Sequence, residues 1–344
     1  MKGFLSEIKF IFFAVAPALA LILASSLLIL FTDRSETGKN IKNMVKLYKL
    51  AIAIYSDNLI AEESVKGIRD GLTEAGMNEN DHYTLKIYSA AGDIAALNGI
   101  IDTIAAERFD LIFSVSTPSL QAAIKKIKKT PIVFSSTGDP IGAGAGKNFS
   151  EHLNNVTGIC SLSDFTGMIN LIREIVPNVK KIGTVFCPAE INSVLYAEYL
   201  KKAALDAGIT LEIAPASSSS EISDAANSLV LSKGCEIICQ IADNLTAAAF
   251  QAVVRPADNA LVPVFGFIDD NVKNGAAISY ARDYRQGGKD SAKMALRILN
   301  GENPAGIPFE YISKTTLSIN KKAAKRNKLN LPEAVIKRAQ TVIE

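Results

Sequence analysis

Residues 113–127, FSVSTPSLQAAIKKI, join an apolar strand to a helix through small polar residues. Thr117 is expected to cap the helix, and Pro118 suits its first position because that N–H group would have no helical partner anyway. The unpaired N–H groups at such a helix start attract anions, and Ser116 and Ser119 add hydroxyl groups beside it. An ordinary capped helix after a strand is the alternative interpretation, so the surrounding sequence has to decide between the two.

Apolar runs and amphipathic segments alternate on both sides of this stretch. In the first half, strands are predicted at 50–55, 85–89, 111–115 and 132–135, and helices at 61–75, 93–107 and 118–128. In the second half, strands are predicted at 155–160, 181–186, 210–214, 236–241, 264–267, 276–280 and 315–319, and helices at 164–175, 193–207, 218–231, 246–254 and 284–299. This order is typical of parallel sheets covered by helices on both faces. We therefore predict an α/β fold of two lobes around a ligand cleft.

The composition is that of a folded protein. The chain has 344 residues, of which 48% are hydrophobic and 21% are charged. This is enough for two packed cores and too apolar for a disordered chain. The formal net charge is +2, whereas a nucleic-acid-binding protein needs a strong basic excess or stripe. Nucleic acid is therefore not an expected partner.

Residues 10–31 form an uncharged apolar segment near the N-terminus. A membrane-spanning helix needs about 20 such residues, whereas the apolar region of a cleaved signal peptide has roughly 7–15. We therefore predict an uncleaved transmembrane signal anchor at 10–31, between a cytoplasmic stub at 1–9 and a tether at 32–47. Cleavage at the internal Ala-Leu-Ala of residues 18–20 is the alternative.

Basic residues are more frequent after this segment than before it. Lys2 and Lys9 precede it, and the residues that follow it are Arg34, Lys39, Lys42, Lys46 and Lys49. The positive-inside rule alone would place the large domain in the cytoplasm, but large domains can be translocated regardless of flanking charge. We give the fold and the family resemblance below more weight. They predict a single-pass protein of the cytoplasmic membrane whose binding domain is extracytoplasmic.

The cysteines and histidines show no metal-binding or catalytic pattern. Cys235 and Cys239 lie four apart on one predicted strand, too far for a disulfide, and neither His82 nor His152 has zinc-site spacing to a cysteine. Free core thiols are predicted for all four cysteines, which are Cys160, Cys187, Cys235 and Cys239. The loop GAGAGKN at 142–148 lacks the first glycine and the final Ser or Thr of a phosphate-binding loop. With no histidine at a strand end, we predict neither a metal, a cofactor nor an enzyme.

Polar residues instead follow the predicted strands, where open parallel sheets bind their ligands. The candidate ligand-binding residues are Tyr55, Ser116, Thr117, Ser119, Asp139, Asn192, Asp243, Asn244 and Asp269. Hydroxyl groups and the helix start at Pro118 suit a carboxylate, and acids such as Asp139, Asp243 or one of the adjacent Asp269 and Asp270 suit an ammonium group. Each residue taken alone has a structural alternative, as a turn residue or a helix cap. Their joint occurrence at the strand ends of both lobes favours the binding of a zwitterion.

Longer segments of the chain resemble the substrate-binding proteins of ABC transporters, in particular those of tryptophan- and tyrosine-type importers. The resemblance covers roughly residue 48 to the end. The segments that carry it are GIRDGLTEAG (67–76), YSAAGDIAALNGIIDTI (88–104), FDLIFSVSTPSLQAA (109–123), TPIVFSSTGDPIGAG (130–144), NVTGI (155–159), NSVLYAEYLKKAALDAGI (192–209), DNLTAAAFQAVV (243–254) and VPVFGFIDDNVKNGAAISYARDYRQGG (262–288).

This resemblance implies a type I periplasmic binding fold, in which two Rossmann-like lobes are joined by three crossovers. Lobe 1 is then expected at 48–158 and 283–312, and lobe 2 at 159–282 and 313–344. The ligand residues that it implies fall on STPS, GDP, NS and DN, which begin at 116, 138, 192 and 243. The chain departs from the family pattern in three places: YSDNLIAEE lacks the usual His-Pro pair, AAGD lacks a glutamine before its glycine, and a membrane span replaces the usual signal.

The predicted function is that of a membrane-tethered, extracytoplasmic solute-binding protein of an ABC importer. It would close by a hinge movement on a small ligand, an amino acid or related metabolite, and present it to permease and ATPase subunits. Two alternatives remain open. One is a ligand-sensing subunit of the same fold, which signals to a separate membrane protein. The other is an enzyme that uses the same cleft.

Overall fold

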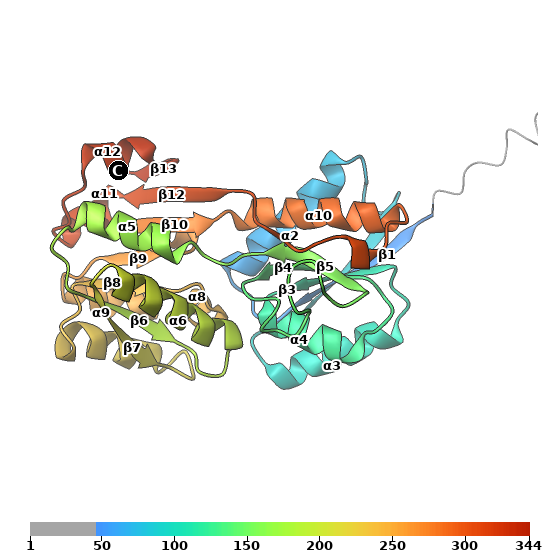
Figure 1. Cartoon of the computed structure of the whole chain (residues 1–344), viewed down its shortest axis with the longest axis horizontal. Helices are drawn as coiled ribbons and strands as arrows, with labels where there is room; N and C mark the ends of the chain where they lie inside the picture. The colour runs from blue at the N-terminus through green and yellow to red at the C-terminus, as the bar shows by residue number, and fades with distance from the viewer. Residues whose placement is uncertain (1–45) are drawn as a thin grey trace, which may run out of the picture. The chain divides into compact units, whose positions relative to one another are not determined.

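The computed structural model describes residues 46–344, which contain two sheets (Figure 1). The first sheet is parallel, with the strand order β11-β5-β4-β3-β1-β2. Its strands are β1 (Tyr48–Ile54), β2 (Tyr83–Ser89), β3 (Leu111–Val115), β4 (Ile132–Thr137), β5 (Val156–Cys160) and β11 (Glu310–Tyr311). With its covering helices this sheet is the first lobe.

The second sheet has the order β13-β12-β10-β9-β8-β6-β7 and is parallel except for the antiparallel pair β10–β12. Its strands are β6 (Lys181–Phe186), β7 (Thr210–Pro215), β8 (Ile237–Gln240), β9 (Val264–Gly266), β10 (Ile278–Arg282), β12 (Thr315–Asn320) and β13 (Thr341–Ile343). With its helices this sheet is the second lobe. The predicted two-lobe α/β architecture is thereby confirmed.

Strand β1 shows why helices cover both faces of the first sheet. Its side chains point alternately to the two faces, so Leu50 and Ile52 join one apolar cluster while Ala51 and Ala53 join another. The first cluster lies under two helices and the second under two others: α2 (Leu59–Glu74) with α10 (Tyr284–Leu299), and α3 (Ile94–Ala106) with α4 (Thr117–Lys126). These four side chains are fully buried, as expected for a central strand.

Helices α2 and α10 pack closely because glycines lie at their contact. A Cβ atom on Gly67 would lie 2.0 Å from the carbonyl oxygen of Arg285, and one on Gly288 would lie 2.2 Å from that of Ser64. A side chain at either position would force the helices apart. The two helices are adjacent in Figure 1, although they are far apart in the sequence.

The second lobe repeats the same arrangement. In β8, Ile237 and Ile238 point to opposite faces and join different apolar clusters. The helices over these faces are α5 (Phe165–Ile175) and α6 (Ile191–Asp206) on one side, and α7 (Ile222–Asn227) and α9 (Gln251–Asn259) on the other. The remaining elements are α8 (Asn244–Ala248), α11 (Lys321–Arg326), α12 (Glu333–Arg338), a π-helical turn (Ser228–Ser232) and two 3₁₀ turns (Asp269–Val272 and Pro304–Gly306).

Within residues 46–344 the chain passes between the lobes three times. The passages lie between β5 and α5, between β10 and α10, and between β11 and β12. Each lobe is therefore built from segments that are distant in the sequence. The strand ends that face the other lobe come from both halves of the chain.

Several predicted boundaries were wrong for local reasons. Helix α4 begins at Thr117, so Ser116 and not Thr117 is its N-cap, and no side chain makes the capping hydrogen bond. The helix predicted at 246–254 is two helices, α8 and α9, and the second continues through Pro256. The helix predicted at 218–231 starts only at Ile222 and changes to a π-helical turn at Ser228. At α4 the reason is the backbone of Ser116, whose φ of 91° lies outside the helical range.

Two further predictions concern the N-terminus and the thiols. The membrane span predicted at 10–31 lies outside the described residues, and none of the helices in 46–344 is long and apolar enough to cross a bilayer. All four cysteines are buried and free, which confirms that prediction.

Candidate functional site

The strand ends of the first lobe place hydroxyl groups around the start of α4. Ser116 follows β3 with a left-handed φ of 91°, and its N–H donates to the carbonyl of Ser135 at 3.1 Å. Ser116, Thr117 and Ser119 are all buried, and the Oγ atoms of Ser116 and Ser119 are 3.4 Å apart. The Oγ1 atom of Thr137, at the end of β4, is buried and has no hydrogen-bond partner among the described residues. Such an atom costs free energy unless a partner meets it.

The strand ends of the second lobe meet at a buried carboxylate, that of Glu190. Glu190 is the N-cap of α6 and is 4% exposed. Its Oε2 accepts the backbone N–H of Asn244 at 3.0 Å and the side-chain Nδ2 of Asn244 at 2.6 Å, and its Oε1 accepts the N–H of Leu245 at 3.1 Å. The Nδ2 of Asn192 approaches the same Oε2 at 3.5 Å. Glu190 therefore joins the starts of α6 and α8.

This carboxylate lies in an unusual electrostatic environment. Burial, followed by the nearby Asp243, raises the pKa of Glu190 to about 7, although the hydrogen bonds from Asn244 and Leu245 act against that shift. Burial also raises the pKa of Asp243. Burial, followed by the charge of Glu190, raises the pKa of Tyr55 in the first lobe to about 12. The charge of Glu190 therefore acts across the two lobes.

Asn192 carries a second buried atom without a partner. It is 4% exposed, and its Oδ1 has no hydrogen-bond partner among residues 46–344. Because its Nδ2 is directed to Glu190, the Oδ1 is the side of the amide that is left to accept a hydrogen bond. Each lobe thus has a buried, unpaired oxygen: that of Thr137 at the end of β4 in the first and that of Asn192 at the start of α6 in the second.

The predicted acids are not all available to a ligand. Asp243 is fully buried as the N-cap of α8; its Oδ2 accepts the hydroxyl of Ser193 at 2.5 Å, and its Oδ1 accepts the N–H of Thr246 at 2.8 Å. Asp139 accepts the N–H of Ile141 at 3.0 Å within its own turn. Asp243 thus uses both carboxylate oxygens within its own lobe, and Asp139 uses one.

Asp269 lies apart from these groups, beside the passages between the lobes. Its Oδ1 accepts the hydroxyls of Thr316 at 3.0 Å and Ser318 at 2.6 Å. It lines a cavity of about 200 Å³ together with Asp283 and Lys314. The structure brings together Asn192, Asp243 and Asn244 in the second lobe and Ser116, Thr117 and Ser119 in the first, but not Asp269.

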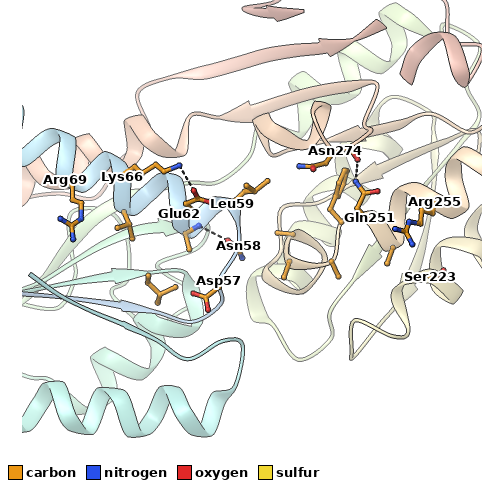
Figure 2. Close-up of a pocket in the computed structure, with 18 residues that line it drawn as sticks. Asp57, Asn58, Leu59, Glu62, Lys66, Arg69, Ser223, Gln251, Arg255 and Asn274 are labelled. Carbon is orange, nitrogen blue, oxygen red and sulfur yellow. Dashed lines mark hydrogen bonds and ion pairs between the residues drawn. The ribbon is translucent and has the colours of Figure 1, made fainter. Parts of the chain in front are cut away.

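A cavity of about 1030 Å³ opens beside these strand ends and is lined by both lobes (Figure 2). Figure 2 shows Asp57, Asn58 and Leu59 on one side of it, at the start of α2, and Gln251 and Arg255 of α9 on the other. Its apolar wall is formed by Ile54, Leu59, Val65, Ala247, Ala248 and Phe250. None of the nine predicted site residues lines it, although Ile54 and Asp57 flank Tyr55. The cavity therefore adjoins the polar strand ends without containing them.

Glu190 and Thr137 belong to the candidate site described here but not to the nine predicted site residues. Thr137 ends β4 and Glu190 lies in the loop after β6, so their positions after predicted strands were visible in the sequence. Their roles were not, because the donors of Glu190 lie 54 and 55 residues away in sequence and the unpaired state of Thr137 depends on its three-dimensional surroundings.

The sequence and the fold were compared with known proteins. Residues 49–343 match the family model described as ABC transporter substrate binding protein. A tyrosine-binding protein of Clostridioides difficile is 26% identical over 77% of this chain and 76% of its own. A conserved domain protein from Vibrio cholerae has a TM-score of 0.82 at 32% identity, covering 86% of this chain and 100% of that one.

Two further solved structures differ in their ligand state. The ABC domain in complex with L-Trp from Streptococcus pneumoniae has a TM-score of 0.82 at 28% identity, covering 87% of this chain and 100% of that chain. A substrate binding protein with adhesive properties from Clostridium difficile, in its ligand-free, open structure, has a TM-score of 0.68 at 25% identity, covering 86% and 99%. The present structure thus overlaps better with the L-Trp complex than with the open form.

Proposed function

Since the chain belongs to the ABC transporter substrate binding protein family, whose members are extracytoplasmic binding proteins and not enzymes, we propose that it binds an aromatic amino acid between its two lobes. The L-Trp complex and the tyrosine-binding relative support this class of ligand. The observation that carries the proposal is the pair of buried, unpaired oxygens in opposite lobes, Thr137 Oγ1 at the end of β4 and Asn192 Oδ1 at the start of α6.

The zwitterionic part of the ligand suits these groups. Its carboxylate accepts hydrogen bonds from the hydroxyl of Thr137 and from the start of α4, where Thr117 and Ser119 lie. Its ammonium donates to Oδ1 of Asn192, the residue whose Nδ2 faces the Glu190 carboxylate. Asp243 does not contact the ligand in this arrangement, because both of its oxygens already accept hydrogen bonds within the second lobe. It holds the starts of α6 and α8 in place.

The side chain of the ligand suits the neighbouring cavity. An aromatic ring needs an apolar wall, and Leu59, Val65 and Phe250 supply one beside the strand ends. Ligand contacts with both lobes favour their closure, since a ligand shifts an equilibrium only through contacts that differ between its two states. We further propose that residues 10–31 hold the protein in the membrane and that permease and ATPase subunits receive the closed form.

Isothermal titration calorimetry of the full chain in detergent tests this function. We expect L-Trp, L-Tyr or L-Phe to bind with a dissociation constant in the micromolar range or tighter, and D-glucose, a ligand of comparable size without an amine or a carboxylate, not to bind. Binding of D-glucose without binding of any aromatic amino acid would refute the proposed ligand class.

A further inference from the structure

We propose that Glu190 is a positioning residue that holds the ligand-binding amides of the second lobe, and that it releases a proton to the solvent when a ligand ammonium binds to Asn192. The inference rests on the proposed function for the identity of the ligand. Its structural part, the holding of Asn192 and Asn244, depends only on the contacts of Glu190.

The contacts of Glu190 determine the direction of two amide side chains. Its carboxylate receives Nδ2 of Asn244 at 2.6 Å and faces Nδ2 of Asn192 at 3.5 Å, so the NH₂ ends of both amides turn toward it. The carbonyl end of Asn192 is therefore directed away, and it is this atom that is buried without a partner. A reversed amide would place two N–H donors where a ligand ammonium has to bind.

Glu190 also fixes the position of α8. This helix has five residues, and the backbone N–H groups of Asn244 and Leu245 point at the carboxylate at 3.0 Å and 3.1 Å. Isolated helices of this length are not stable, so tertiary contacts have to hold them in place. Loss of the carboxylate charge weakens both backbone hydrogen bonds together with the bond to the Asn244 side chain.

The charge of Glu190 lacks a cationic partner within residues 46–344. The groups whose pKa is linked electrostatically to Glu190 are acids, none of them cationic: Asp243 at the start of α8, Tyr55 directly after β1 and Cys187 directly after β6. None of the ion pairs formed by lysines and arginines of the described chain includes Glu190. A buried carboxylate among acidic neighbours retains a proton up to a higher pH than an exposed one.

A ligand ammonium changes this balance. A positive charge beside Asn192 favours the ionised form of Glu190, so the pKa of this carboxyl falls when the ligand binds. At pH values near and below 7, binding then releases part of a proton to the solvent. The affinity is expected to rise as the pH increases from 6 to 8. At the higher pH the Glu190 carboxyl of the free protein is already ionised, so binding does not have to remove its proton.

The ligand-dependent test is calorimetry of the full chain with L-Trp, L-Tyr and L-Phe as probes. Titrations at pH 6.5 in phosphate and in imidazole, which differ in ionisation enthalpy, measure the number of protons released. We expect a net release in the wild type and none in Glu190→Gln, with a loss of affinity of about tenfold at pH 8, the equivalent of about 1.4 kcal/mol. Glu198→Gln, an exposed residue on the same helix, is the matched control and should behave as the wild type.

A second measurement does not depend on the ligand. Hydrogen exchange at the N–H groups of Asn244 and Leu245 should become at least tenfold faster in Glu190→Gln and stay unchanged in Glu198→Gln. Glu190→Asp, which keeps the charge, should restore part of the protection and part of the proton release.

The outcomes separate this inference from the proposed function. Equal proton release in wild type and Glu190→Gln, or unchanged hydrogen exchange at Asn244 and Leu245, overturns the role of Glu190. Absence of binding by all three aromatic amino acids overturns the proposed ligand class and with it the coupling to an ammonium, while hydrogen exchange still decides whether Glu190 holds α8.

Discussion

The hydroxyl of Ser193 donates to the carboxylate of Asp243 at 2.5 Å, and these two residues lie 50 positions apart in the sequence. The same hydroxyl accepts the N–H of Cys187 at 2.8 Å. One buried chain of hydrogen bonds thus joins the end of β6, the start of α6 and the start of α8. The neighbouring Glu190 completes this junction, which supports the second-lobe side of the proposed site.

Asp243→Asn is expected to affect stability more than binding. The new NH₂ group cannot accept a hydrogen bond from Ser193 or Thr246, so the free energy of unfolding should fall by about 1–3 kcal/mol. The affinity for an aromatic amino acid should fall less than tenfold, because both oxygens are used within the lobe. Urea unfolding and calorimetry measure the two effects, with Asp224→Asn on the exposed side of α7 as the control. A hundredfold loss of affinity at unchanged stability would instead place the ligand amine on Asp243.

Thr137→Val is expected to have the opposite effect. The valine side chain has nearly the same shape, and the hydroxyl that it lacks has no partner in the described protein, so stability should stay equal or rise slightly. Affinity should fall about tenfold, since the ligand carboxylate loses one donor. Thr157→Val in the adjacent strand is the contrasting control, because that hydroxyl donates to the carbonyl of Ile307 at 2.8 Å and its loss should lower stability. Unchanged affinity in Thr137→Val would remove Thr137 from the site.

Ser116→Gly is expected to stabilise the protein. Ser116 has a φ of 91°, a conformation that glycine adopts without strain, so the free energy of unfolding should rise, by about 1 kcal/mol. Ser116→Ala keeps the strain and removes only the hydroxyl, and it separates the two contributions. Thermal or urea unfolding measures whether the Ser116→Gly variant has a higher free energy of unfolding than the wild type. A less stable glycine variant would show that the hydroxyl contributes more than the strain costs.

Stability should depend on pH through Glu190. The folded-state pKa of Glu190 is raised from 4.5 to about 7, so the folded protein holds a proton that the unfolded chain has already lost. The free energy of unfolding should therefore decrease as the pH rises from about 4.5 to about 7 and level off above that value. Glu190→Gln should lack this part of the slope, whereas Glu198→Gln should retain it. Identical pH profiles of the wild type and Glu190→Gln would contradict the raised pKa.

The orientation in the membrane can be measured directly. Because the family is extracytoplasmic, a phosphatase reporter fused to the C-terminus should be active and a cytoplasmic reporter should be silent. Activity of the cytoplasmic reporter would support the positive-inside interpretation of the lysines after residue 31. Mass determination of the mature N-terminus distinguishes an uncleaved anchor from a cleaved signal.

The order of strands and helices was predictable because burial on both faces gives strands such as β1 and β3 continuous apolar runs. The short edge strands β11 and β13 were not predicted, since two or three residues carry no periodic signal. The cap of α4 was displaced by one residue because Ser116 takes a left-handed backbone that polar residues of this size rarely adopt.

The site was predictable in its location and less so in its roles. Strand-end position identified Asn192 and Asn244, which lie beside Glu190. The same rule did not distinguish Asp243, whose oxygens support the fold, from Thr137, whose oxygen is unpaired. That distinction depends on which groups the folded chain brings opposite each other.

Gly138 lies between the lobes against Tyr196, and a Cβ atom there would be 1.4 Å from the phenol oxygen of Tyr196. Gly138 follows the last strand residue of β4, whereas Tyr196 belongs to α6 of the other lobe. A methyl group on Gly138 would act as a permanent spacer and reduce the fraction of molecules that can close. Because apparent affinity scales with that fraction, the absence of a side chain at Gly138 is a condition for strong retention of any ligand, whatever contacts the ligand makes.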